Sequence, residues 1–250
     1  MSTVGNYLYG FTGSDYRPPA PLRGLAGAPV RVVGFGEVAA VVSHHPVQPL
    51  RPSRSNLEPH HRIVRQIATQ AALVPVAFGH ITENEREVLA VMRGNYEEIR
   101  HELARLDNKS EMALTLKWTV DNIFDFMVRT NRDLRELRDR VFRGGPPSMA
   151  DKLEVGSQFE ATLTRERERL AAVLIGAFGT LPCEVVPDPP RDERTVWQGA
   201  LLIERSREQE FLAALPRAAA LFDTNYTIAY SGPWPAYSFV RLRLQKPQAA

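Results

Sequence analysis

The chain has 250 residues, 44% hydrophobic and 24% charged, and this balance excludes a wholly disordered or fibrous protein. Lysine and arginine number 31 against 29 for aspartate and glutamate, so the formal net charge is +2, too small a surplus to indicate a nucleic-acid binder. The single cysteine, Cys183, excludes an intramolecular disulfide and a multi-cysteine metal cluster. Because no apolar run is long enough to span a bilayer and the N-terminus lacks a signal-peptide pattern, a cytoplasmic protein is expected.

The first part of the chain predicts strands that pair in an antiparallel manner. Residues 4–11 are rich in aromatic and β-branched side chains, which indicates a strand. Two apolar runs, 30–33 and 38–42, flank Gly34-Phe35-Gly36. Glycine supplies the positive φ angle that a tight turn needs, so this pattern predicts a hairpin.

Helices and a further strand complete the first 120 residues. The spacing of apolar residues predicts a helix over 56–73 and a short strand over 73–79. Thr82 is expected at the N-cap of the next helix, with Glu85 closing a capping box, and this helix continues to Leu106. Residues 112–118 alternate between apolar and polar, which predicts a strand with one buried face. That face is expected to pack on the preceding helix, placing Leu114, Leu116 and Trp118 against Val88, Met92 and Tyr96.

The remaining residues predict a second domain built around two long helices. Apolar stripes over 123–141 and from 149 to 174 indicate an αα-hairpin joined by Gly144-Gly145-Pro146-Pro147. Strands over 183–186, 195–203 and 226–230, a helix over 207–221, and a last strand carrying Val240, Leu242 and Leu244 follow it.

The change of character near Val120 sets the expected domain boundary. We therefore predict an α+β protein of two domains, residues 1–120 and residues 121–250. The second domain carries the helical hairpin and the C-terminal tail.

The sequence contains no pattern that supports catalysis or a bound cofactor. Gly34-Phe35-Gly36-Glu37-Val38-Ala39 matches a dinucleotide fingerprint, but that site needs a helix starting at the glycines, whereas a strand follows here. The adjacent pairs His44-His45 and His60-His61 point in divergent directions on a strand or a helix, so neither pair forms a metal-ligating face. Ser43-His44 lacks the strand–turn–helix elbow of hydrolases. We expect no catalytic, cofactor-binding or metal-binding residue, and no enzyme.

The segment Ser231–Phe239 is the least ordinary part of the chain. Pro233 and Pro235 bracket Trp234 and restrict φ, so the loop is stiff. Trp234, Tyr237 and Phe239 offer a large amphipathic surface, and they are the candidate partner-binding residues. An equally good interpretation is that Trp234 fills a local core.

Several blocks of the sequence resemble the gas vesicle protein GvpL/GvpF family. The blocks occur in the family's order and span almost the whole chain. They are Tyr7–Gly10, Gly36–Ser43, His60–Val64, Val74–Gly79, Glu111–Lys117 and, most specifically, Gly232–Phe239. One departure is Ala77, where the family commonly has arginine before Phe-Gly.

The resemblance implies an accessory, non-enzymatic protein of gas vesicle formation with two α+β domains, the first a modified ferredoxin-like fold. Its expected partners are the hydrophobic main shell protein, whose assembly it would support or whose aggregation it would prevent, and other gas vesicle accessory proteins. Neither nucleic acid nor lipid membrane is an expected partner, and self-association stays open. It would be cytoplasmic and a minor component of the vesicle. The alternative is a small-molecule-binding enzyme or sensor on a ferredoxin-like scaffold, because a fold by itself does not fix function.

We predict that the purified chain folds without metal or nucleotide, because it has no ligand set and is long enough to bury a sizeable core. Thermal unfolding with and without a strong chelator checks this. The two transitions should coincide, and a transition that disappears with chelator would refute the prediction.

Overall fold

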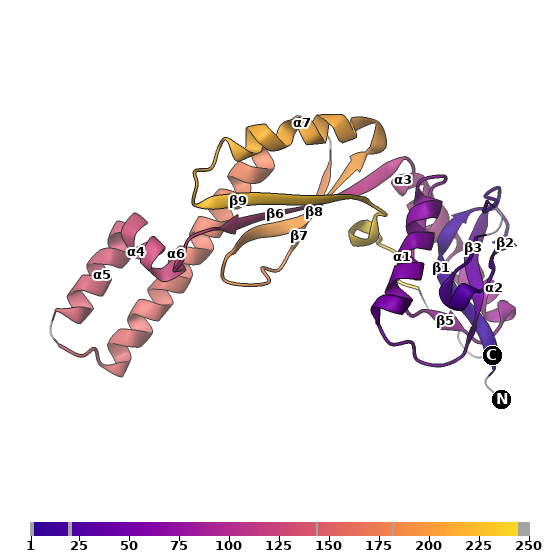
Figure 1. Ribbon diagram of the computed structural model, residues 1–250, viewed down its shortest axis with the longest axis horizontal. Coiled ribbons are helices and arrows are strands. Elements are labelled where there is room, and N and C mark those ends of the chain that lie inside the picture. The colour runs from indigo at the N-terminus through magenta and orange to yellow at the C-terminus, as the bar shows by residue number, and fades with distance from the viewer. Residues whose placement is uncertain (1–2, 20–21, 144, 182, 245–250) are drawn as a thin grey trace. The chain divides into compact units, whose positions relative to one another are not determined.

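The computed structural model describes residues 3–19, 22–143, 145–181 and 183–244 (Figure 1). The chain forms two compact units, Met1–Glu111 together with Gly232–Ala250, and Met112–Ser231. This division differs from the boundary drawn from the sequence at Val120. The chain leaves the first unit inside strand β6 (Lys109–Trp118) and returns to it inside strand β9 (Tyr226–Trp234). The alternation of a strand is continuous, so it does not mark where one core gives way to another.

The first unit contains a five-stranded antiparallel sheet in which β1 (Val4–Gly13) lies inside. β3 (Val38–Pro46) pairs with one edge of β1, and β4 (Val74–Pro75) and β5 (Ile81–Thr82) pair with the other. β2 (Val30–Phe35) pairs with β3, and Phe35 faces Val38 across a turn in which Gly36 has a φ of +60°. Gly36 therefore lies in the predicted hairpin turn, Gly34 lies in β2, and neither glycine begins a helix.

Helices complete this unit. They are η1 (Leu25–Gly27), α1 (Arg54–Ala68), α2 (Glu85–Gly94), α3 (Tyr96–Leu106) and η3 (Tyr237–Phe239). α1 packs on β1, so that Ile63, Val64 and Ile67 form a core with Tyr7 and Tyr9.

The predicted start of α2 is wrong. Thr82 belongs to β5, where it faces Asn6 of β1, and strand pairing therefore takes it away from the helix. Asn84 is the N-cap, and its side-chain oxygen accepts a hydrogen bond from the Glu87 backbone at 3.0 Å. The Glu87 carboxylate accepts from the backbone of Glu83, the residue before the N-cap, at 2.6 Å, so this bond is not the return bond to the N-cap that completes a capping box.

Two of the predicted long helices are interrupted by asparagine. Asn95 separates α2 from α3, and its side chain donates to the Val91 carbonyl. Asn131 separates α4 (Ile123–Thr130) from α5 (Arg132–Phe142) and caps the second by accepting from the Leu134 backbone. The apolar stripe continues across both breaks, so periodicity alone did not reveal them.

The second unit is built on a four-stranded sheet with the order β7-β8-β6-β9. β7 spans Glu184–Asp188 and β8 spans Thr195–Glu204, and the two pair in an antiparallel manner. The long helix α6 (Met149–Gly176) begins at Ser148 with a complete capping box, and η2 (Arg205–Arg207) leads into α7 (Glu208–Ala219). The predicted helical hairpin is therefore present, with α4 and α5 forming its first arm. Within the described residues, no helix has the length and apolar character needed to cross a membrane.

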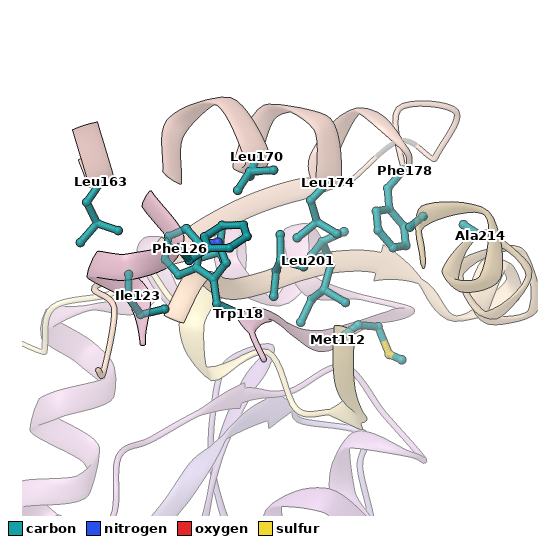
Figure 2. Close-up of a cluster of buried hydrophobic side chains, with 14 of the residues drawn as sticks. Met112, Trp118, Ile123, Phe126, Leu163, Leu170, Leu174, Phe178, Leu201 and Ala214 are labelled. Atoms are coloured by element: carbon teal, nitrogen blue, oxygen red, sulfur yellow. The ribbon is translucent and has the colours of Figure 1, made fainter. Parts of the chain in front are cut away.

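The alternating face of β6 is buried as predicted, but the prediction of the helix that covers it is wrong. Met112, Leu114, Leu116 and Trp118 are each at most 1% exposed. They share a core with Leu163, Leu170 and Leu174 of α6, Leu201 of β8 and residues of α4 and α7 (Figure 2). Val88 and Met92 of α2 belong to the other unit. Alternation shows which side chains are buried, whereas only the tertiary fold shows what buries them.

The predicted last strand is also wrong. The described residues after η3, from Val240 to Leu244, form neither helix nor strand. Alternating exposure persists there, with Arg241 and Arg243 exposed and their neighbours half-buried. A backbone that lies along a surface produces the same alternation as a strand.

We predict that Trp118→Ala lowers the free energy of unfolding of the second unit by about 3–5 kcal/mol, the usual cost of truncating a large core side chain. Denaturant unfolding followed by circular dichroism measures this change. Leu221→Ala, at a side chain that is 56% exposed, is the control and should change stability by about 0.5 kcal/mol or less. Equal stability of the two variants would contradict the assignment of Trp118 to the core.

Candidate partner-binding groove on the first unit

Helix α1 has one buried face and one face that is largely open to solvent. The buried face carries His60, Ile63, Val64, Ile67 and Ala68. The other face repeats at three- and four-residue spacing, which places its side chains in one row along the helix. This row consists of Glu58, His61, Arg62, Arg65, Gln66 and Thr69.

The C-terminal segment after β9 is fixed to the first unit by several hydrogen bonds. The Ser238 backbone and hydroxyl both donate to the Glu111 carboxylate, at 2.8 and 2.9 Å. The Arg241 backbone donates to Glu102 at 3.0 Å, and the Arg105 guanidinium donates to the carbonyl of Phe239. Phe239 itself is 2% exposed. These contacts fix the position of the segment. The predicted loop Ser231–Phe239 is not a loop throughout, because its residues as far as Trp234 belong to β9.

Glu102 and Arg105 form the buried ion pair that supports this segment. Their side chains are 5% and 12% exposed, and two guanidinium nitrogens of Arg105 lie 2.9 Å from the two carboxylate oxygens. Burial raises the pKa of Glu102, but the hydrogen bonds from Arg105 and the Arg241 backbone outweigh it, and the pKa lies below its ordinary value. The carboxylate therefore stays ionised and continues to accept both bonds.

A buried histidine connects α1, β1 and the C-terminal segment. His60 is 0% exposed, and its Nδ1 lies 2.8 Å from the Tyr7 hydroxyl while its Nε2 lies 3.0 Å from the Tyr237 hydroxyl. The Gly79 backbone donates to the Tyr7 oxygen at 3.1 Å. The imidazole also stacks on the ring of Tyr9, with centroids 5.9 Å apart. Three segments that are distant in the sequence thus meet at His60, and a fourth, at Gly79, is joined to them through Tyr7.

The protonation state of His60 follows from these contacts. The Tyr7 oxygen accepts a hydrogen bond from the Gly79 backbone, and its hydroxyl proton is donated to Nδ1 of His60. The imidazole therefore carries its own proton on Nε2, which donates it to the Tyr237 hydroxyl. Burial and the neighbouring His61 lower the pKa of His60 from 6.5 to about 4. The neutral imidazole is therefore the form that the fold accommodates. Burial also raises the pKa of Tyr7 and Tyr237 above their ordinary value, which keeps both hydroxyls protonated.

A groove lies between the exposed face of α1 on one side and the end of β9 with the C-terminal segment on the other. Its volume is about 780 Å³, and Glu111, Trp234, Pro235 and Tyr237 complete its lining. Trp234 is 41% exposed, and the Arg65 guanidinium lies over its ring, 5.7 Å from the ring centre. Within the described ranges, no three histidine, cysteine, aspartate or glutamate side chains are placed to hold a metal ion. The arrangement offers an exposed aromatic ring and cations, which suits recognition more than catalysis.

The sequence model of the gas vesicle synthesis protein GvpL/GvpF family matches residues 5–241. The chain belongs to this family. It is 29% identical to gas vesicle protein F of a Streptomyces species, over 95% of this chain and 100% of that one. It is 27% identical to gas vesicle protein F2 of Halobacterium salinarum, over 100% and 98% of the two chains.

Crystal structures of two other family members share the fold. The gas vesicle protein GvpF from an Anabaena species superposes with a TM-score of 0.85, covering 97% of this chain and 100% of that one at 23% identity. GvpF from Microcystis aeruginosa gives a TM-score of 0.82, covering 95% and 99% at 21% identity. The resemblance read from the sequence and the α+β fold class are confirmed. Family membership supports an accessory role at the gas vesicle and points away from an enzyme.

In this GvpL/GvpF family member, the three candidate residues occupy different environments. Trp234 is exposed in the groove, Tyr237 is half-buried with its hydroxyl on His60, and Phe239 is buried. Phe239 therefore supports the segment from inside and offers little surface to a partner. Ala77, which departs from the family pattern, is exposed.

Sequence reasoning missed the residues that position Trp234. His60 and Glu111 were each part of a block that resembles the family, and this was the one signal that they matter. Arg62 lies in the same block as His60, whereas Arg65 showed only helical spacing. Their role depends on the C-terminal segment, which follows them by some 170 residues and whose approach to α1 no local pattern indicates.

We predict that His60 makes the protein less stable in acid. The unfolded chain binds a proton near pH 6.5, whereas folded His60 resists it down to about pH 4. The contribution of His60 to the free energy of unfolding is therefore fully present above pH 6.5. Below that pH it decreases, by up to about 1.4 kcal/mol per pH unit.

Denaturant unfolding of the wild type and of His60→Gln, from about pH 7 to about pH 4.5, measures this dependence. The other titrating groups are common to both proteins. The wild-type curve should therefore be the steeper one, and parallel curves would contradict a neutral, buried His60.

Proposed function

We propose that this protein binds the hydrophobic main shell protein of the gas vesicle, and so supports its assembly or prevents its aggregation. Trp234, an aromatic side chain that is 41% exposed on a rigid frame, is the observation that carries the proposal. Its family supplies the context, because relatives that match nearly the whole chain are gas vesicle proteins.

The position of Trp234 has the properties of an interaction hot spot. Tryptophan contributes strongly to interfaces because it buries a large area at a small cost in side-chain entropy. Here the neighbouring residues are already fixed by Glu111, Glu102 and His60. Binding would therefore order little additional chain, and that lowers the entropic cost of association. A side chain with this exposure also disfavours the interpretation that Trp234 fills a core.

The same proposal extends to location and further partners. We place the protein at the gas vesicle as a minor component, in contact with the shell protein and with other accessory proteins. An enzyme or sensor on this scaffold is disfavoured, because the family members that match over nearly full length are named as gas vesicle proteins.

We predict that Trp234→Ala weakens binding of the main shell protein by roughly 30-fold, which corresponds to a hot spot of about 2 kcal/mol. The melting temperature should change little, because the side chain is not part of a core. Pull-down of the shell protein and a thermal melt, run on the same preparation, measure both quantities.

Phe142→Ala is the matched control, since Phe142 is an aromatic residue that is 55% exposed at the end of α5 in the other unit. It should bind the shell protein like the wild type. Full binding by a folded Trp234→Ala variant would remove this groove from the interface. Loss of binding in Phe142→Ala alone would move the interface to the helical hairpin.

A further inference from the structure

Two arginines in the groove have no carboxylate partner among the residues that the structure describes. Arg62 donates one N–H to the Arg23 carbonyl at 2.8 Å, and Arg65 lies over Trp234. Arg31 and Arg100 of the same unit do have such partners, with Arg31–Glu85 at 2.7 Å and Arg100–Glu37 at 2.9 Å. Both groove guanidiniums are exposed on the same face of α1. Each guanidinium has five N–H donors, most of which are not used by these contacts, and this indicates an anionic ligand.

The acidic side chains of the groove do not satisfy these donors. The Glu111 carboxylate is occupied by two hydrogen bonds from Ser238. Glu58 stands one helical turn before Arg62, and the described part of the chain shows no ion pair between them. The groove therefore combines an apolar ring with two guanidiniums that have no carboxylate partner in the described part of the chain.

The length of the groove indicates the kind of ligand. Its lining on α1 runs from Glu58 to Thr69, which corresponds to about 16 Å of helix. An extended peptide of about five residues covers this distance, whereas a phosphate or a free carboxylate would fill only a small part of it.

We propose that the groove binds a peptide segment in which a carboxylate side chain lies next to an apolar one. The carboxylate accepts hydrogen bonds from Arg62 and Arg65, because a guanidinium fork matches the two oxygens of a carboxylate. The apolar side chain packs on Trp234 and Pro235. This inference rests on the proposed function, in that the segment belongs to the main shell protein. The inference adds that the groove selects a segment with an acidic side chain and does not bind every hydrophobic segment.

Calorimetric titration with synthetic peptides that tile the shell protein tests the inference. We expect at least one tile with an acidic residue beside an apolar residue to bind the wild-type protein. The same tile with its Asp or Glu replaced by Asn or Gln should bind roughly tenfold more weakly, as should the wild-type tile with the Arg65→Glu variant. Arg65→Lys keeps the charge but loses the fork, and its affinity should lie between the two.

Arg54→Glu is the matched control, because Arg54 is exposed on α1 and does not line the groove. It makes the same change of charge and should leave binding unchanged. A thermal melt of each variant verifies that the fold is retained.

The outcomes separate this inference from the proposed function. If full-length shell protein binds and depends on Trp234 but not on Arg65 or on its own carboxylates, the inference fails and the function stands. If the shell protein does not bind at all, both fail. Equal weakening by Arg54→Glu, or binding of inorganic phosphate in place of every tile, would also overturn the acidic peptide site.

Discussion

The first unit depends on the pair of hydrogen bonds that His60 makes with Tyr7 and Tyr237. The three residues come from α1, from β1 and from the segment that follows β9. Hydrogen bonding at both ring nitrogens fixes the orientation of the imidazole. The same two bonds fix the position of α1 relative to β1 and to the C-terminal segment. A buried histidine without these partners would cost free energy, since an unsatisfied polar group in an apolar core is expensive. Without the C-terminal segment, the His60 Nε2 would lose the hydroxyl of Tyr237 as its partner.

The position of Trp234 follows from this constraint. Glu111 and Glu102 hold the chain on the C-terminal side of the tryptophan, at Ser238 and Arg241, and His60 holds Tyr237 just before them. Each bond involves a charged or buried group, so each resists displacement more than an exposed neutral contact would. The groove is therefore preformed on one side by a helix and on the other by a segment with little freedom. A preformed site of this kind suits a partner that is itself flexible or aggregation-prone, because the partner alone then loses entropy on binding.

Two strands, β6 and β9, pass from one unit to the other. β6 and β9 each begin in one unit and end in the other, and the residues of β6 from Met112 onward join the core shown in Figure 2. Glu111, the residue immediately before that core begins, holds Ser238 in the first unit instead. Adjacent residues of one strand thus serve different purposes. Several of the blocks that resemble the family, although spread through the chain, meet at His60.

The sequence by itself determined the elements whose signals are local. Hairpin glycines, the alternation of β6 and the stripe of α6 each depend on near neighbours, and the family resemblance came from short contiguous blocks. The helix breaks at Asn95 and Asn131 were not predicted, because an asparagine that interrupts a helix leaves the spacing of the apolar residues unchanged. Only the tertiary structure decided which core buries Trp118, that Val240–Leu244 is not a strand, and that Arg65 lies beside Trp234. Those outcomes depend on contacts between residues far apart in the chain, and such contacts are set by the packing of whole elements and not by the order of residues within one.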